Sequence, residues 1–267
     1  MLFRSQGHIG TMTGGAYQHI WLSGVKDENG NLVNPYSAFS VPLLTTEEQF
    51  RAVENHMMLV QAGKRYVDGE AQIGRAASLT NNMWTDLLRD RDSIGLPLHQ
   101  EKLGLTAQYT KALKEGDFET VVKVINRYVE IRDELCRRWL SLVIDAHNGA
   151  QGLPEYAARY ASKVFDENNP DYDGYKLVRD MYFGTDGQLR LGDNLRYVTL
   201  YNLGTESLVK EAREAGIALM GLGAGGPGAN LIAISVKGNE YTRIFLEKHG
   251  IKELTDEDEA RAIIHGT

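Results

Sequence analysis

The stretch Gly221-Leu222-Gly223-Ala224-Gly225-Gly226-Pro227-Gly228-Ala229-Asn230 decides the fold of this chain, because apolar runs of strand length stand on both sides of it. Ile217 to Met220 precedes the glycines, and Leu231 to Ser235 follows them. Three of these glycines match the GxGxxG spacing of dinucleotide-binding loops, but such a loop must lead from a strand into a helix. The run after the glycines is short and β-branched. The sequence therefore predicts two antiparallel strands joined by a glycine loop.

The glycines in this loop have a definite physical use. Glycine adopts positive φ angles readily and leaves the backbone amides without side-chain cover. Successive free amides form a concave nest that binds anions such as phosphate. A tight hairpin, in which the glycines only satisfy the turn geometry, is the structural alternative. Both interpretations stay open from this loop alone.

Leu219 to Ser235 resembles the third motif of the GHMP kinases, the superfamily of galactokinase, homoserine kinase, mevalonate kinase and phosphomevalonate kinase. In that motif a helix leads into a Gly-Ala-Gly-Gly-Gly-Gly loop, which is followed by an apolar strand. The match runs from Gly223 to Gly226, is interrupted at Pro227 and resumes at Gly228.

Three further stretches resemble the sugar and sugar-phosphate kinases of this superfamily, in the same order along the chain. Thr13 to Gln18 resembles the segment that carries Gly-x-x-Asp-Gln, and Leu59 to Lys64 resembles a Leu-Val-Tyr-Thr-Gly-Lys strand. Ala112 to Leu135 resembles a pair of helices around Gly-Asp. Because these stretches are collinear over almost the whole chain, the set is more specific than any one of them.

The resemblance implies an α+β fold with a GHMP kinase-like two-domain arrangement. Residues 1–96 would be the remainder of the N-terminal domain, and residues 97–267 a ferredoxin-like C-terminal domain with an extended middle segment at 154–195. It also implies phosphate transfer from ATP, with Mg²⁺, to a hydroxyl of a sugar or sugar phosphate. Fucokinase-like and heptose-7-phosphate-kinase-like members are the most similar branches.

The resemblance also assigns roles to individual residues. Tyr17 and Gln18 occupy the positions of the family's catalytic Asp-Gln pair. His19, Lys64 and Arg65 are substrate candidates, because His19 adjoins Gln18 and the two cations follow a predicted strand end. A satisfied histidine and a solvated cation pair are the structural alternatives. The loop residues expected to brace the nucleotide phosphates are Gly223, Ala224, Gly225, Gly226 and Gly228.

Two departures from the family bear on activity. Its phosphate-cradling motif, Pro-x-x-x-Gly-Leu-x-Ser-Ser-Ala, is missing, and only twelve residues precede Thr13, where the motif would lie. We therefore expect an N-terminally truncated piece of a longer kinase, which by itself binds ATP weakly. Neither Tyr17 nor Gln18 is a carboxylate that could act as a base, although phosphoryl transfer depends mainly on positioning and charge stabilisation. Two alternatives stand beside a kinase: a catalytically weak homologue that senses a sugar or nucleotide, and a GHMP-fold decarboxylase.

Composition excludes several other classes of protein. With 42% hydrophobic and 24% charged residues, a chain of 267 residues can bury a sizeable core. The net charge of −7 argues against a nucleic-acid partner, and no apolar run reaches membrane-spanning length. The single cysteine, Cys136, excludes an internal disulfide and is typical of a reducing, cytoplasmic compartment. The histidines show no zinc-site spacing, so no metal ligands are predicted. The oligomeric state stays open.

Hydrophobic periodicity predicts the remaining elements. Strands are expected at 38–44 and 56–61, with a hairpin at 25–33. Gly95-Leu96-Pro97 is the predicted domain boundary. The order of the last elements predicts a sheet with helices on one face. Helices are expected to begin at 14 and to span 46–54, 70–91, 99–114, 117–146, 205–215 and 239–248.

Overall fold

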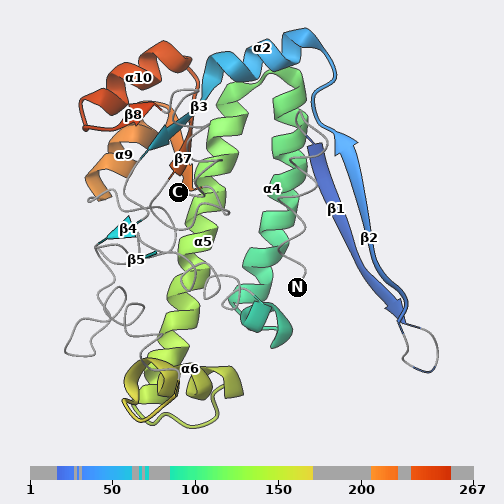
Figure 1. The fold of residues 1–267 in the computed structure, drawn as a ribbon, viewed down its shortest axis with the longest axis vertical. Coiled ribbons are helices and arrows are strands. Elements are labelled where there is room, and N and C mark those ends of the chain that lie inside the picture. Colours follow the sequence, from blue (N-terminus) through green and yellow to red (C-terminus); the bar gives the residue numbers. More distant parts are fainter. Residues whose placement is uncertain are drawn as a thin grey trace.

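Figure 1 shows the fold of the chain in a computed structural model. It combines long helices with small antiparallel sheets, so the predicted α+β class is confirmed. The structure describes residues 17–26, 29, 32–61, 66–67, 70–71, 85–170, 206–221 and 230–253.

A four-stranded sheet joins strands that lie far apart in the sequence. Its strands are β3 (Met57–Gln61), β6 (Ile217–Gly221), β7 (Asn230–Ser235) and β8 (Lys252–Glu253), in the order β6-β7-β3-β8. Each neighbouring pair is antiparallel. A chain division after residue 96 would separate β3 from β7, its hydrogen-bonded neighbour. The sheet therefore depends on residues from both predicted domains.

Helices cover both faces of this sheet. The prediction that helices cover only one face is therefore wrong. On one face, Ile217 and Leu219 pack with α9 (Glu206–Glu214) and α10 (Asn239–Glu247). Ala218 lies between them in β6 and therefore points to the opposite face, where it packs against the helical hairpin described next. Figure 1 shows α9 and α10 on one side of the sheet and α5 on the other. Burial on both faces explains why β6 and β7 read as continuous apolar runs.

The helical hairpin consists of α4 (Gly95–Glu115) and α5 (Phe118–His147), close to the two predicted helices. Gly116 ends α4 with φ +70°, a left-handed conformation that glycine adopts without strain. Asp117 then caps α5, because its side chain accepts a hydrogen bond from the Thr120 amide at 3.0 Å. A link of two residues thus reverses the chain and keeps the two helices antiparallel.

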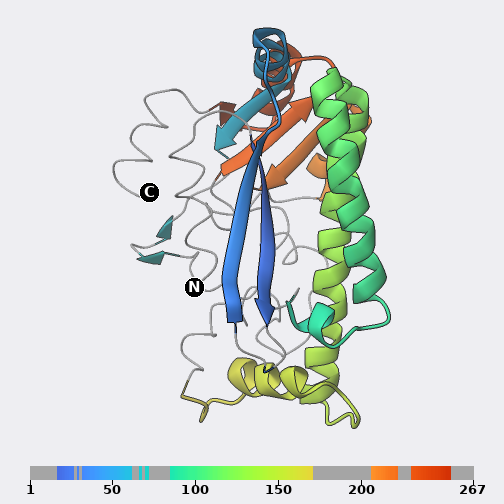
Figure 2. The same cartoon turned by 90° about the vertical axis from the view of Figure 1, so that its right-hand side faces the viewer.

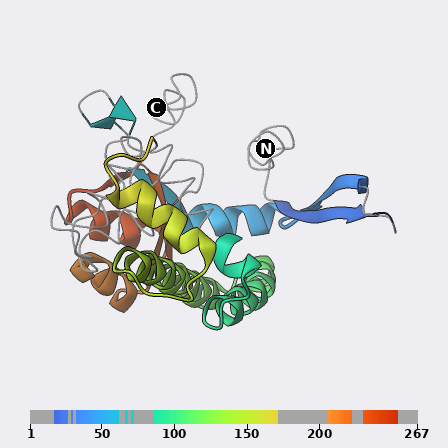
Figure 3. The same ribbon diagram turned by 90° about the horizontal axis from the view of Figure 1, so that it is seen from below.

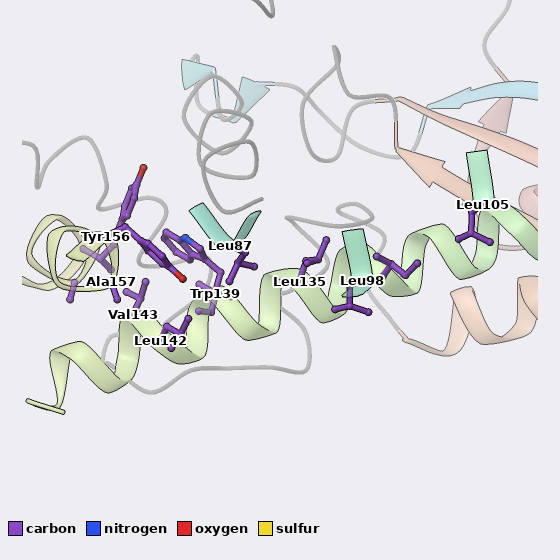
Figure 4. Close-up of a cluster of buried hydrophobic side chains, with 14 of the residues drawn as sticks. Leu87, Leu98, Leu105, Leu135, Trp139, Leu142, Val143, Tyr156 and Ala157 are labelled. Atoms are coloured by element: carbon purple, nitrogen blue, oxygen red, sulfur yellow. The ribbon is translucent and has the colours of Figure 1, made fainter. Parts of the chain in front are cut away.

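The largest core cluster runs along α5 and ends at α6 (Glu155–Phe165), a short helix that crosses the far end of α5 (Figures 2 and 3). Trp139 is 1% exposed and meets the ring of Tyr160 edge-on, with centroids 4.8 Å apart. Figure 4 shows the cluster extending along α5 toward α6, with these labelled members: Leu87, Leu98, Leu105, Leu135, Trp139, Leu142, Val143, Tyr156 and Ala157.

The predicted boundary residues, Gly95-Leu96-Pro97, form the first turn of α4. Proline is accepted there since the first amides of a helix have no intrahelical acceptor. Gly95 is required for packing: a Cβ atom at this position would lie 2.9 Å from the Cβ atom of Leu87. The glycine marks a close approach of two helical segments.

A separate hairpin of β1 (Tyr17–Lys26) and β2 (Leu32–Pro42) precedes α2 (Glu47–His56). The hairpin around Asn29 is confirmed, but it is longer than predicted, and the helix expected to begin at residue 14 is wrong from Tyr17 onward. Aromatic and β-branched residues in β1 favour a strand once β2 supplies the antiparallel partner. Helix α2 agrees with the prediction and begins with a capping box between Thr46 and Gln49.

The helix predicted over 70–91 is wrong at its start. Glu70–Ala71 forms β5, which pairs with β4 (Tyr66–Val67). The Asp68-Gly69 pair between these strands is a strong hairpin signal that overrides the helical spacing. Residues 85–89 are helical as predicted, and 72–84 lie outside the described residues.

Candidate functional site

The candidate site lies at one end of the four-stranded sheet. Strand β6 ends there at Gly221 and β7 begins there at Asn230, with Gly221 paired to Leu231. Strand β3 ends beside them, since Gln61 is paired to Asn230. The short strand β8 also begins at this end, with Lys252 opposite Gln61. The two strand ends that flank the glycine loop and the last residue of β3 therefore lie at the same end of the sheet.

The glycine loop joins two antiparallel neighbours, as predicted. Because a strand begins at Asn230, where a dinucleotide fingerprint would continue as a helix, the GxGxxG match is not a dinucleotide motif. The strand ends leave eight residues, 222–229, for the loop. The predicted phosphate-bracing residues, Gly223 to Gly226 and Gly228, are among these eight and lie outside the described residues.

The predicted substrate cations follow β3. Lys64 and Arg65 come three and four residues after Gln61, the last residue of β3, and both lie outside the described residues. Because Gln61 pairs with Asn230, the segment that carries these cations leaves the sheet next to the start of β7. The segment that carries the cations therefore begins after Gln61, and the glycine loop ends before Asn230, the cross-strand partner of Gln61.

The predicted catalytic pair lies in a different part of the structure. Tyr17, Gln18 and His19 are the first three residues of β1 and pair with Pro42, Val41 and Ser40 of β2. In Figures 1 and 3 this hairpin extends away from the four-stranded sheet, on the other side of α4. The structure therefore does not bring these three residues to the sheet end that carries the glycine loop.

Contacts at the opposite end of β3 and β7 hold the sheet in place. The Asn239 side chain, at the start of α10, donates from Nδ2 to the carbonyl oxygens of Glu54 and Met57. His56 Nδ1 donates to the Ser235 carbonyl oxygen at 2.8 Å, and its ring stacks on Phe118 with centroids 4.0 Å apart. No local sequence signal marks these residues, because their partners lie more than 60 positions away.

A buried polar cluster lies where α5 meets α6. The Asp86 side chain is 6% exposed, and Trp139 donates to its Oδ2 atom at a long 3.4 Å. Burial raises the pKa of Asp86 above its ordinary value. Burial also raises the pKa of Tyr156, with the negative charges of Asp90, Asp92 and Asp86 adding to the effect. Among the described residues, the Tyr156 hydroxyl has no hydrogen-bond partner. An acidic residue, Asp86, within the helix predicted over 70–91 was the available signal for this cluster.

Asp92 connects this cluster to the start of α4. Its Oδ1 atom accepts hydrogen bonds from the amides of Ile94 at 3.0 Å and Gly95 at 2.8 Å. The Arg138 guanidinium of α5 donates to the same carboxylate, from Nη2 at 2.8 Å and from Nε at 3.0 Å to Oδ2. Asp92 therefore orders the first turn of α4 and fixes it against α5.

Comparison with known proteins finds no matching family model, no matching curated protein and no matching solved structure. Within the described ranges, no helix combines the length and apolar character needed to cross a membrane. The same residues contain no group of three or more histidine, cysteine, aspartate or glutamate side chains arranged to hold a metal ion.

Proposed function

We propose that this chain transfers phosphate from ATP to a hydroxyl of a sugar or sugar phosphate, as a kinase of the GHMP type. The order of elements supports a ferredoxin-like C-terminal domain in such a kinase. Strand β3, the helices up to α9, β6, β7, α10 and β8 follow one another along the chain, and the sheet order is β6-β7-β3-β8. Apart from the short β4–β5 pair that follows β3, this order agrees with the split βαβ arrangement of ferredoxin-like sheets and so supports the proposal. In the proposed two-domain arrangement, divided after residue 96, β3 joins this sheet from the partial N-terminal domain, to which the β1–β2 hairpin also belongs.

The observation that carries the proposal is the length of the glycine loop between paired strands. A hairpin that needs glycine only for its turn closes in two to five residues, whereas β6 and β7 are joined by eight. Four of the eight are glycines, a composition that lets backbone amides approach a phosphate group without side-chain cover. This favours an anion-binding loop over the tight-hairpin alternative.

The segment after β3 supports the same ligand chemistry. Lys64 and Arg65 follow the strand that ends beside the loop, and cationic side chains form strong, charge-assisted hydrogen bonds to phosphate. Mg²⁺ is held mainly by substrate phosphates and one or two carboxylates. We propose that Mg²⁺ binds together with the nucleotide, through its phosphates.

A second candidate function is nucleotide or sugar binding with little catalysis. It is favoured by the residues at the family's catalytic positions, Tyr17 and Gln18, which are not carboxylates. A phenol with an ordinary pKa near 10 is a poor base at pH 7. Catalysis without a base would then depend on positioning and on charge stabilisation by amides and Mg²⁺.

Binding and turnover measurements distinguish these functions. We expect ligand-observed NMR titration with MgATP to detect binding by the purified chain. Gly225→Val and Gly226→Val should each weaken MgATP binding about tenfold or more, since a valine side chain would cover backbone amides that glycine leaves open to an anion. Gly104→Val is the matched control, because a Cβ atom at Gly104 has nothing within 4 Å.

A coupled assay of ADP release with a panel of sugars and sugar phosphates tests catalysis. ADP release that depends on one of these compounds supports the kinase. MgATP binding without turnover supports the second candidate. Absence of MgATP binding, or binding that both valine variants retain, would contradict a nucleotide role for the loop.

A further inference from the structure

We draw no further inference here: the strongest candidate, the buried cluster of Asp86, Trp139 and Tyr156 where α5 meets α6, has a tyrosine hydroxyl without a hydrogen-bond partner among the described residues, but nothing in the structure shows a cavity or bound group that would make this cluster more than part of the packed core.

Discussion

The ion pair between Asp92 and Arg138 should contribute measurably to the stability of the helical hairpin. An exposed ion pair contributes about 0–1 kcal/mol, whereas removing one partner of a fully buried pair costs about 3–5 kcal/mol. The Asp92 and Arg138 side chains are 8% and 27% exposed, and the guanidinium makes two hydrogen bonds of 3.0 Å or less to Asp92 Oδ2. We therefore expect Asp92→Asn to lower the free energy of unfolding by about 2 kcal/mol.

A double-mutant cycle separates the ion pair from the capping role of Asp92. Asp92→Ala should cost about 1 kcal/mol more than Asp92→Asn, because alanine also removes the acceptor for the Ile94 and Gly95 amides. Combining Asp92→Asn with Arg138→Met should give a coupling energy of about 2 kcal/mol. Urea unfolding followed by far-UV circular dichroism measures each free energy.

The pH dependence provides an independent check. Burial alone would raise the pKa of Asp92, but hydrogen bonds from Arg138 and from the amides of Gly95 and Ile94 lower it below its ordinary value. A group with a lowered folded pKa contributes stability above its unfolded pKa, about 3.9 for aspartate, and loses it as the pH falls through the folded pKa. The difference between wild type and Asp92→Asn should be full at pH 7 and should shrink below about pH 4.

An exposed pair on α9 serves as the control. Lys210 and Glu214 lie 3.8 Å apart with side chains 78% and 66% exposed, so their coupling should stay below about 0.5 kcal/mol. If the coupling between Asp92 and Arg138 is equally small, or if it does not change with pH, this ion pair does not stabilise the α4–α5 hairpin.

Three further substitutions test other features. Asp86→Asn should raise the free energy of unfolding at pH 7 by on the order of 1 kcal/mol. The raised pKa of Asp86 means that its contribution is most favourable below the unfolded pKa and is lost as pH rises through the folded pKa; a gain at pH 4 equal to that at pH 7 would contradict this. Arg91 has φ +49° at the turn before α4, so Arg91→Gly should raise the thermal midpoint, by the equivalent of about 0.5–1 kcal/mol, and a lower midpoint would refute strain there. Gly238 has φ +86°, and a Cβ atom there would lie 3.2 Å from the Asn55 carbonyl oxygen. Gly238→Ala should therefore cost about 1–2 kcal/mol in urea unfolding, while unchanged stability would show that the α2–α10 contact relaxes.

Local signals in the sequence predicted the elements that depend on neighbouring residues. The glycine loop between two apolar runs, the helical spacing over 46–54 and the Gly-Asp pair at 116–117 each act over a few positions, and the structure has a strand pair, a helix and a helical hairpin there. The helix expected over 70–91 is wrong at its start, because Glu70–Ala71 pairs with Tyr66–Val67 as a strand, and the intervening sequence Asp68-Gly69 is typical of a hairpin.

Features that depend on distant residues could not be predicted in the same way. Nothing near Asn239 indicates that its side chain binds two carbonyl oxygens more than 180 positions earlier in the chain. The burial of Asp86 likewise depends on Trp139 and Tyr156, which reach it only after α5 and α6 have packed. The candidate site is partly predictable for the same reason: the sequence indicates the glycine loop, but only the sheet order reveals that β3 ends beside it.

The position of β3 in the sheet has a consequence for biosynthesis. Leu59 pairs with Ile232, which is 173 residues later in the chain (232 − 59). At about 5–20 residues per second, a ribosome needs roughly 9–35 s to supply that partner. Helices α4 and α5 contact each other locally and can pair within that time, whereas the apolar strand Met57–Gln61 must wait without a sheet partner from β7 or β8. The nascent chain therefore carries an unpaired hydrophobic strand while these 173 residues are made, and chaperone binding to this strand would protect it until β7 and β8 emerge.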